Sequence, residues 1–592
     1  MDSIEKNALD WMKKWADNTV DVSGKGDNIK RILEYKGITL WWFIETAVFE
    51  SYRGLNYPIS MRKLIENIER IEAIIKAEKP DQIYFLNTSV PHNFYLGKIC
   101  LALGLDTVHV KSPKVKILRV FWIKIFPFLL SCYFRFRIFC RKLISGLLNL
   151  LFKKEKAGLD AKKIIIVSNT LNWRNKKDFT FGSLIKEINE KKPILRIDFP
   201  VSSVIGIKRI LQQKQQRRKH LDFKSAEEYK VDYNHINKSL KRILNRYYNL
   251  RHSPVYYKSY DITDVFYEQM DFHICHYLLR NCIYYTETLS NIIKTENPDC
   301  LVVTDEYNPI GRATVTVGKI HCIKTIAIQH GVVSAERPGF YHYFDEISNK
   351  AEYKSPYYPL PDTTAVFGPY YKELLETVGN YPPASVEVTG SIRYDDIIKR
   401  RQSFDRDNTL VSLGIDPDQK VILYTSQPIS KEENDKVLSA LINAISGIPD
   451  LQLIIKLHYA EKGVNESIIS EYDNEIIILQ NYDIYELINA CDVLITVFST
   501  TALEAMILER PVITINLTGK RDMMPYAESG AALGVYSRND LKNAILAVFE
   551  DENVISSLRT NSRKFVYQHA YEVDGNATKR LMDIVLLDNK LP

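Results

Sequence analysis

TIAIQHG at residues 325–331 and LIIKLH at residues 453–458 decide the fold class. Each is a run of apolar, strand-forming residues that ends in a histidine, His330 in the first and His458 in the second. Buried parallel strands read as continuous apolar runs, and ligands of α/β folds bind at the carboxyl ends of such strands. The two stretches therefore predict two α/β units, with a ligand site in a cleft between them.

The composition is that of a globular chain. With 592 residues, of which 45% are hydrophobic and 26% charged, the chain is long enough for two to four domains. The eight cysteines are scattered without a CxxC pair, so neither a disulfide framework nor a zinc site is indicated, and a reducing cytosol is expected. The charged residues Met1–Lys6 lack the apolar core of a secretory signal.

One segment, residues 111–156, is both basic and rich in aromatic side chains. From Lys111 to Lys154 there are eleven Lys or Arg residues and no Asp or Glu, and the charges interrupt every apolar run before it reaches the length of a transmembrane helix, about 18 residues. Such a mixture favours contact with an anionic membrane surface. A helix pair with snorkelling cations and a dimer interface are the alternatives. Nothing in the segment resembles a nucleic-acid recognition motif, so no nucleic-acid partner is expected.

The alternation of predicted strands and helices divides the chain into two doubly wound α/β domains that face each other across a cleft. The first, residues 1–385, contains the basic segment and a helical region over 206–296. The second spans residues 386–573, and residues 574–592 form a C-terminal helix expected to cross back to the first domain. The predicted strands lie at residues 82–87, 107–110, 163–169, 194–198, 300–305, 325–328, 365–368 and 386–390, and then at 420–425, 451–457, 475–479, 493–497 and 512–515.

Three consecutive hydroxyl residues, Ser499, Thr500 and Thr501, follow the predicted strand 493–497 and precede a helix. Hydroxyl groups beside the unpaired N–H groups of a helix start make an anion site, which predicts phosphate binding. Glu504, about one turn into the helix, is placed to hold a ribose or sugar hydroxyl. The structural alternative is an ordinary helix cap in which Glu504 belongs to a capping box.

Charged residues at other strand ends complete the candidate site. Lys456 and His458 are placed to neutralise a diphosphate leaving group. His330 is suited to deprotonate an acceptor hydroxyl, a role that contributes about 10²–10⁴-fold in rate. Gly331 allows close approach of the backbone. Asp305 and Glu306, after the preceding strand, are a second candidate base. Structural histidines and strand-capping acids are the alternatives.

No metal site is expected. The pairs Asp405/Asp407 and Asp416/Asp418 have the DxD spacing of a metal motif, but both lie in segments with loop or turn composition. No other cofactor is indicated.

Taken together, five segments resemble a known group of enzymes. IAIQHG at 326–331, VTGSIRYD at 388–395, KLH at 456–458, STTALEA at 499–505 and DGNA at 574–577 are similar to segments of GT-B-fold transferases of surface polysaccharide assembly. Teichoic-acid glycerophosphotransferases, capsule polysaccharide transferases and bacterial sialyltransferases with HP and SS/T motifs are the nearest of these. The resemblance covers roughly Pro298 to Arg580 and implies two Rossmann-like domains.

The resemblance also implies roles for individual residues. His330 would be the base, while His458, Ser499 and Thr500 would bind the donor phosphates. Gly390 lies in the linker segment and is expected to be a second position of close backbone approach. Two positions depart from the family pattern: Tyr459 replaces proline, and Gln329 replaces the aromatic residue of glycerophosphotransferases. The departures leave the donor open between a CMP- or CDP-linked group and a UDP- or GDP-sugar.

The predicted function is therefore that of a metal-independent glycosyltransferase or glycerophosphotransferase. It would move a group from a nucleotide-activated donor to a surface-glycan or lipid-linked acceptor, at the cytoplasmic face of the cell membrane. Two alternatives remain at this stage. One is an enzyme like UDP-N-acetylglucosamine 2-epimerase, which would act without an acceptor. The other is a non-catalytic, membrane-associated assembly protein with a vestigial nucleotide cleft.

Overall fold

The structure is a computed structural model of the whole chain. It describes residues 3–18, 28–50, 60–79, 82–85, 100, 106–109, 132, 136, 139–140, 143, 163–169, 173–174, 177–178, 181–199, 222–271, 274, 278–304, 306–333, 339–347, 357–458, 461, 463–464, 466–469 and 476–587.

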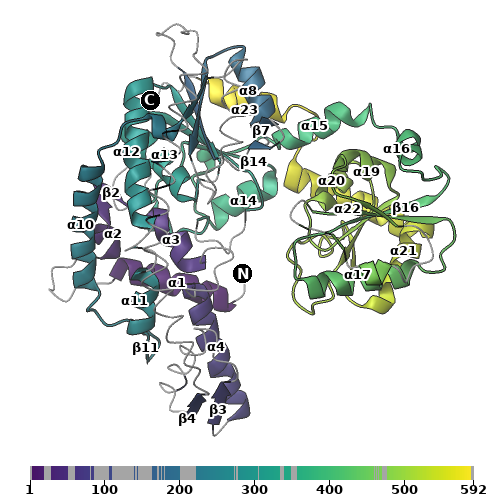
Figure 1. Cartoon of the computed structure of the whole chain (residues 1–592), viewed down its shortest axis with the longest axis horizontal. Coiled ribbons are helices and arrows are strands. Elements are labelled where there is room, and N and C mark those ends of the chain that lie inside the picture. Colours follow the sequence, from purple (N-terminus) through teal and green to yellow (C-terminus); the bar gives the residue numbers. More distant parts are fainter. Residues whose placement is uncertain are drawn as a thin grey trace. The chain divides into compact units, whose positions relative to one another are not determined.

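The described residues divide into two compact units (Figure 1). Unit 1 comprises those within Met1–Ala365, Lys372–Glu387 and Met582–Pro592, and unit 2 those within Val366–Tyr371 and Val388–Leu581. The chain thus passes between the units four times. The last passage lies inside helix α23, Ala577–Leu586.

Unit 1 contains a seven-stranded sheet with the order β15-β14-β13-β12-β5-β8-β9. The chain fills one side of the sheet with β5, β8 and β9, and then the other side with β12 to β15, so the order reverses between β5 and β12. Strand β12 pairs in parallel with both β5 and β13, and β8 pairs in parallel with β5 and β9. The strands of this sheet are β5 (Ile164–Asn169), β8 (Ile194–Phe199), β9 (Asp222–Ser225), β12 (Cys300–Thr304), β13 (Lys324–Ile328), β14 (Thr363–Val366) and β15 (Val386–Val388).

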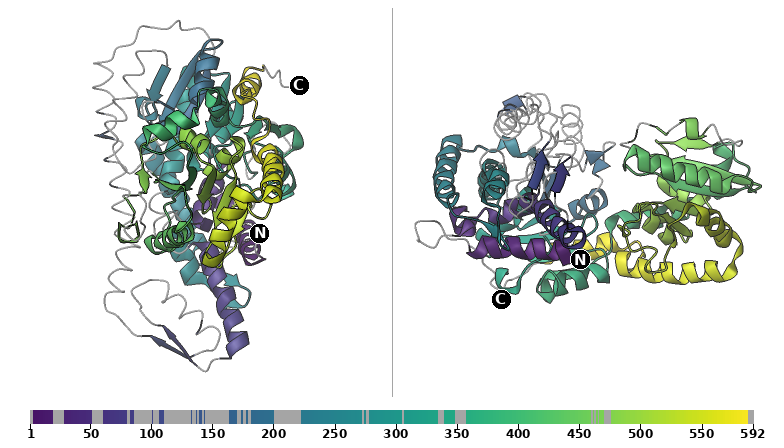
Figure 2. Two further views of the ribbon diagram at one scale, coloured as in Figure 1. Left: turned by 90° about the vertical axis from the view of Figure 1, so that its right-hand side faces the viewer. Right: turned by 90° about the horizontal axis from the view of Figure 1, so that it is seen from below.

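Helices and short strand pairs make up the rest of the described part of unit 1. The helices of unit 1 are α1 (Ser3–Asn18), α2 (Ile29–Ile32), α3 (Trp41–Glu50), α4 (Met61–Glu78), α8 (Gly182–Asn189), α10 (Tyr233–Leu250), α11 (Thr263–Asp271), α12 (Leu278–Glu296) and α13 (Pro309–Ile320), and α14 (Pro369–Thr377) begins in unit 2 and ends in unit 1. Two-stranded sheets pair β1 (Glu34–Tyr35) with β2 (Ile38–Thr39), β3 (Gln82–Phe85) with β4 (Asp106–His109), β6 (Trp173–Arg174) with β7 (Lys177–Asp178), and β10 (Tyr256–Tyr257) with β11 (Tyr260–Asp261). The pair β3–β4 lies at the C-terminal end of α4 (Figure 2).

Unit 2 contains a six-stranded sheet with the order β18-β17-β16-β19-β20-β21, in which every neighbouring pair is parallel. Its order reverses between β16 and β19. The strands are β16 (Lys420–Thr425), β17 (Leu451–Lys456), β18 (Ile477–Leu479), β19 (Val493–Thr496), β20 (Val512–Ile515) and β21 (Leu533–Val535). The helices are α15 (Ile392–Arg401), α16 (Arg406–Ser412), α17 (Lys431–Ile445), α18 (Glu466–Ile469), α19 (Ile484–Ala490), α20 (Thr501–Ile507), α21 (Leu541–Glu550) and α22 (Glu552–Ala570), followed by α23.

Both faces of the second sheet are covered, which explains why its strands are continuously apolar. Successive side chains of a strand point to opposite faces. Val421 and Leu423 accordingly belong to one hydrophobic core, which includes residues of α19 and α20. Ile422 and Tyr424 belong to another core, which includes residues of α17 and α21. The structure therefore confirms the predicted fold class of two doubly wound α/β domains, one built on each sheet.

The structure corrects the sequence prediction at several elements. Within the predicted helical region 206–296, residues 222–225 form edge strand β9, and residues 261–296 contain two helices, α11 and α12. Strands β3 and β4 pair with each other in a sheet of their own. Strand β21 was not predicted. Most of the basic segment 111–156 lies outside the described residues.

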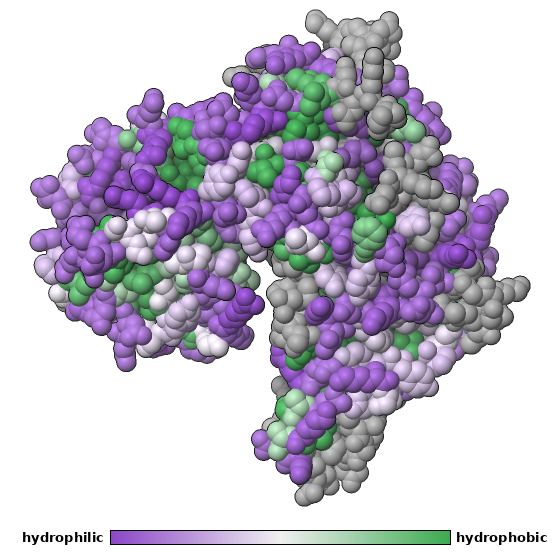
Figure 3. All heavy atoms as spheres, turned by 180° about the vertical axis from the view of Figure 1, so that it is seen from behind, coloured by the Kyte–Doolittle hydropathy of each residue, from purple (hydrophilic) through white to green (hydrophobic). Residues whose placement is uncertain are grey.

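The surface of the described residues is mixed in polarity. On the face shown in Figure 3, hydrophilic residues predominate and hydrophobic residues form small groups. Among the helices in the described ranges, none is both long enough and apolar enough to cross a bilayer.

Candidate functional site

The carboxyl ends of β16 and β19 carry the first group of candidate residues. This is the point of unit 2 where the strand order reverses, and ligands of open α/β sheets bind outside the strand ends at such a point. The Thr425 and Thr501 hydroxyl oxygens lie 2.9 Å apart, and the Phe498 backbone N–H donates to Gln427 Oε1 at 2.7 Å. The loops that follow the two strands are therefore joined at the position where the sequence predicts phosphate binding.

Ser499 and Thr500 lie between β19 and α20. Ser499 Oγ accepts a hydrogen bond from the Thr501 N–H at 3.2 Å, and the Ser499 carbonyl accepts one from the Tyr526 hydroxyl at 3.1 Å. Thr500 is the N-cap residue of α20, is exposed, and makes no side-chain cap hydrogen bond. Its hydroxyl is thus presented to solvent beside the helix start, and the capping box of the structural alternative does not form.

Glu504 has a different environment from the one its sequence position predicts. Its side chain is fully buried and forms an ion pair with Arg393 of α15. Burial raises the pKa of the Glu504 carboxyl group, and the Arg393 charge opposes this shift. In this structure the carboxylate therefore links α20 to α15 and has no surface open to a ligand.

Lys456 and His458 lie at the carboxyl end of β17, next to β16. The Lys456 ammonium group donates to the Gln480 carbonyl at 2.8 Å and to the Leu457 carbonyl at 3.3 Å, and burial lowers its pKa. The His458 backbone N–H donates to Ser426 Oγ at 3.1 Å and to Glu461 Oε2 at 3.0 Å. Both residues are thus at the predicted strand edge, and Lys456 already has backbone partners there.

Three polar residues at this edge escaped the sequence reasoning: Ser426, Gln427 and Glu461. The Ser426 hydroxyl donates to the Glu461 carboxylate, which also accepts from Asn434 Nδ2 at 2.8 Å. Ser426 and Gln427 directly follow the strand 420–425, so the rule that singled out His458 would have found them too. Glu461 follows no strand directly and gives no such signal.

In unit 1, His330 follows β13 and is exposed. Its ring centroid lies 6.2 Å from that of Tyr307, which follows β12. The preceding Gln329 is buried, and its Nε2 donates to the Gly331 carbonyl at 2.8 Å. A Cβ atom added to Gly331 would meet no atom within 4 Å, so packing within the chain does not require a glycine there.

Glu306, the second candidate base, is buried after β12. Its charge acts on two buried neighbours, Arg312 and Tyr381. Burial lowers the pKa of Arg312 to about 10 despite the opposing influence of Tyr381 and Glu306. Burial raises the pKa of Tyr381, and the Glu306 charge adds to this shift. Of the candidate bases, His330 is therefore exposed and Glu306 is buried, while Asp305 lies outside the described residues.

Gly390 and the two DxD pairs have structural explanations. Gly390 has a φ of +79°, and a Cβ atom there would lie 3.2 Å from the Ala577 Cβ atom of α23. The group that closely approaches the Gly390 backbone is therefore a helix of the same chain. Asp405 caps α16 by accepting from the Asn408 N–H at 3.0 Å, and Asp416 accepts from the Asp418 N–H at 3.0 Å. Within the described ranges, no group of three or more His, Cys, Asp and Glu residues is arranged to hold a metal ion.

Comparison with solved structures finds proteins of similar fold at low identity. A UDP-GlcNAc 2-epimerase from Neisseria meningitidis bound to UDP-GlcNAc is 15% identical, with a TM-score of 0.43 over 72% of this chain and 99% of its own. A variant of the wall teichoic acid polymerase TagF is 16% identical, with a TM-score of 0.39 over 78% of this chain and 97% of its own. A calicheamicin glycosyltransferase is 11% identical, with a TM-score of 0.41 over 72% and 98%. Similarity at this level does not bear on substrate.

A comparison with curated proteins finds no match. The model of one protein family does match, over residues 208–587, which is more than half of the chain and includes both candidate sites. Its members transfer a group from a nucleotide-activated donor, as the sequence predicts. By this match, the chain belongs to the family of CDP-glycerol:poly(glycerophosphate) glycerophosphotransferases.

Proposed function

We propose that this transferase uses a CDP-linked donor, such as CDP-glycerol, and that it adds the transferred group to a hydroxyl of a polymeric or lipid-linked surface glycan. The family match supports a CDP-linked donor over a UDP- or GDP-sugar. The observation that carries the site assignment is the joining of the β16, β17 and β19 ends through Ser426, Thr425 and Thr501. Two hydroxyl-rich strand ends at the reversal point of a parallel sheet, with Lys456 and His458 at the neighbouring strand end, suit a diphosphate.

In this proposal, the donor phosphates bind at Ser499, Thr500 and Thr501, with Lys456 and His458 beside them. Thr500 presents an exposed hydroxyl at the start of α20. The Lys456 ammonium group would have to exchange its bond to the Gln480 carbonyl for one to phosphate. Glu504 supports this region from within, through Arg393. No metal ion takes part in the proposed reaction.

His330 is the proposed base. It takes the proton of the acceptor hydroxyl while the acceptor oxygen bonds to the donor phosphorus. The bond from that phosphorus to the nucleoside monophosphate breaks, and CMP leaves. Exposure at the end of β13 supports this role, because the imidazole is open to an incoming acceptor. Glu306 is the weaker candidate, since its side chain is buried.

Nucleotide binding tests the donor site. Thermal unfolding of the wild type would be measured with CMP, CDP, UDP and GDP, and compared with a Ser499→Ala/Thr500→Ala variant. A ligand present at one hundred times its Kd stabilises the fold by about 2.7 kcal/mol, so CDP or CMP should give a clear shift that the variant loses. A Ser412→Ala/Ser446→Ala variant is the matched control, because these residues precede β16 and β17 and lie toward the amino ends of those strands. Absence of a shift with all four nucleotides contradicts the donor assignment.

We also propose that the basic segment attaches the enzyme to the cytoplasmic face of the membrane. Three of its described residues are exposed apolar side chains at helical spacing: Phe136, Phe139 and Leu143, which are 58%, 59% and 52% exposed. Apolar residues on one face, with eleven cations and no acidic residue nearby in sequence, suit an anionic lipid surface.

Vesicle binding tests this attachment. The wild type should sediment with vesicles containing phosphatidylglycerol and should not sediment with pure phosphatidylcholine vesicles. A Phe136→Glu/Phe139→Glu variant should lose most of this binding, whereas Ile74→Glu, at an equally exposed position on α4, should keep it. Equal binding by all three proteins, or none by the wild type, contradicts the proposal.

A further inference from the structure

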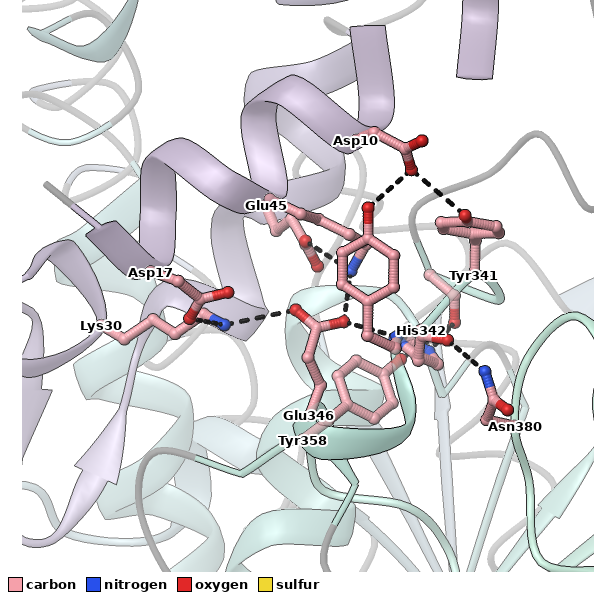
Figure 4. A network of polar contacts seen from close by, with 12 residues as sticks. Asp10, Asp17, Lys30, Glu45, Tyr341, His342, Glu346, Tyr358 and Asn380 are labelled. Atoms are coloured by element: carbon pink, nitrogen blue, oxygen red, sulfur yellow. Dashed lines mark hydrogen bonds and ion pairs between the residues drawn. The ribbon is translucent and has the colours of Figure 1, made fainter. Parts of the chain in front are cut away.

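A buried ion network joins the N-terminal helices of unit 1 to the segment 339–347, which follows His330 in the chain (Figure 4). At its centre is Glu346, in the short 3₁₀ helix Phe344–Glu346. Lys13 Nζ of α1 lies 2.7 Å from Glu346 Oε2, and Lys30 Nζ of α2 lies 3.2 Å from Glu346 Oε1. All three side chains are at most 5% exposed. A single carboxylate thus ties two helices to one segment of backbone.

Further contacts extend this network to α3 and to two tyrosines. Lys13 Nζ also lies 3.3 Å from Glu45 Oε1 of α3. Asp10 Oδ1 of α1 accepts from the Tyr343 hydroxyl at 2.6 Å and from the Tyr341 hydroxyl at 3.1 Å. Helix α1 is therefore attached to residues 341–346 by three bonds, one from Lys13 to Glu346 and two that Asp10 accepts from Tyr341 and Tyr343.

The same segment reaches the candidate base through Gly339 and Tyr307. The Gly339 carbonyl accepts from the Tyr358 hydroxyl at 2.9 Å and from Arg312 Nη2 at 3.3 Å. A Cβ atom on Gly339 would lie 2.5 Å from the Tyr307 Cβ atom, so the two backbones are in close contact. Tyr307 packs edge-on against Phe340, with ring centroids 5.0 Å apart, and its ring centroid lies 6.2 Å from that of His330. A displacement of segment 339–346 would therefore move Tyr307, and His330 with it.

We propose that Glu346 is a positioning residue for the acceptor-side base: bound to Lys13 and Lys30, it holds segment 339–346 against Tyr307 and so sets the place of His330. This inference rests on the proposed role of His330. It also assigns a purpose to helices α1–α3. These helices precede the residues matched by the family model. The bonds of α1 and α2 to Glu346, and of α3 to Lys13, tie them to the acceptor side of the proposed reaction.

Glu296 provides a matched control, because it is a second buried glutamate of unit 1 with the same kind of partners. It is 6% exposed and is bound by Lys163 at 2.8 Å and Lys224 at 2.5 Å. It lies four residues before β12, toward the amino end of the strand, whereas His330 follows the carboxyl end of β13. Loss of either carboxylate breaks two ion pairs, which are buried for Glu346 and partly buried for Glu296, but only loss of Glu346 affects the segment beside Tyr307.

The experiment compares Glu346→Gln, Glu296→Gln and the wild type in three measurements: transferase kcat and KM, thermal shift with CDP, and the rate at which diethyl pyrocarbonate modifies His330, read by mass spectrometry. For Glu346→Gln we expect kcat to fall roughly 10- to 100-fold, as for a misplaced catalytic group, with an unchanged CDP shift and a changed rate of His330 modification. For Glu296→Gln we expect kcat per folded molecule and His330 modification to stay within about twofold of the wild type, because the site geometry is untouched.

Equal loss of kcat in the two variants, or unchanged His330 modification in Glu346→Gln, overturns the proposal. If Glu346→Gln does not fold, Tyr343→Phe replaces it, since that change removes the bond from the Tyr343 hydroxyl to Asp10 and so weakens the attachment of segment 339–346 to α1. Full activity of His330→Ala would refute the base assignment instead. The modification rate of His330 in the Glu346 variant does not depend on activity. Failure of the positioning role of Glu346 can therefore be told apart from failure of the base role of His330.

Discussion

Replacement of Glu296 by glutamine should make the stability of unit 1 depend less on pH, by an amount that can be worked out from the structure. The carboxylate accepts from Lys163 and Lys224 and from the Tyr229 hydroxyl at 2.7 Å. Burial by itself would raise the pKa of Glu296, but these three partners outweigh it and lower the pKa from 4.5 to about 2.

The sign and size of the effect follow from this shift. Because the folded-state pKa lies below the unfolded-state value, the stabilisation is fully present well above pH 4.5 and is lost as the pH falls toward 2. Each pKa unit corresponds to about 1.4 kcal/mol, so the difference between wild type and Glu296→Gln should be about 3 kcal/mol at pH 7. The same linkage gives about 1.4 kcal/mol at pH 3 and under about 0.5 kcal/mol at pH 2.

The assay is urea unfolding of both proteins at pH 7, 4.5 and 3. Pulse-labelling hydrogen exchange of peptides from β5 and β12 follows unit 1 separately. The reasoning is refuted if the free-energy difference between the two proteins is the same at all three pH values, or if it grows as the pH falls.

Two further predictions concern unit 2. Asp395 accepts from the Ala577 N–H, the Thr578 N–H and the Thr578 hydroxyl at 2.7–3.0 Å, so Asp395→Ala should cost about 1–3 kcal/mol and expose the start of α23 to limited proteolysis. His569 stacks on Phe565, and burial lowers its pKa from 6.5 to about 4. Since protons then bind preferentially to the unfolded chain, the stability of unit 2 should decline as the pH falls from 6.5 to 4, by up to about 3 kcal/mol. Hydrogen exchange of α22 peptides should show this decline in the wild type and not in His569→Phe; an identical pH dependence in both would contradict the assignment.

The strands that the sequence predicts best are those whose side chains are buried on both faces. Residues 420–425 and 512–515 form strands with the predicted bounds, because their apolar runs reflect two cores. Edge strand β9, with the sequence DFKS, lacks such a run and was predicted as helix. Apolar periodicity thus reports on burial, and it fails where a strand is held mainly by its backbone pairing.

The residues of the candidate site also fall into those whose position the sequence predicts and those whose position it does not. Strand-end position was enough to predict that His458, Ser499 and Thr500 lie at the same edge of one sheet, because the carboxyl ends of parallel strands meet there. It was not enough for Glu504, whose burial against Arg393 depends on the packing of α15, or for Glu461, which reaches Ser426 only through the folded loop. The prediction of a nucleotide-dependent transferase is confirmed by the family match, which favours it over the epimerase and non-catalytic alternatives. The roles of individual residues stay predictions.

The interleaved path of the chain bears on the order in which the protein folds during synthesis. Residues 582–587 belong to unit 1, where the Ile584 and Leu587 carbonyls accept from Lys324 Nζ, both at 2.9 Å. Lys324 opens β13, the strand that leads to His330. After β13, a ribosome must therefore translate about 250 further residues, including the whole second sheet, before the carbonyl groups that bind Lys324 have been made. Unit 2 can be complete before unit 1 is, so unit 2 is expected to precede unit 1 in cotranslational folding.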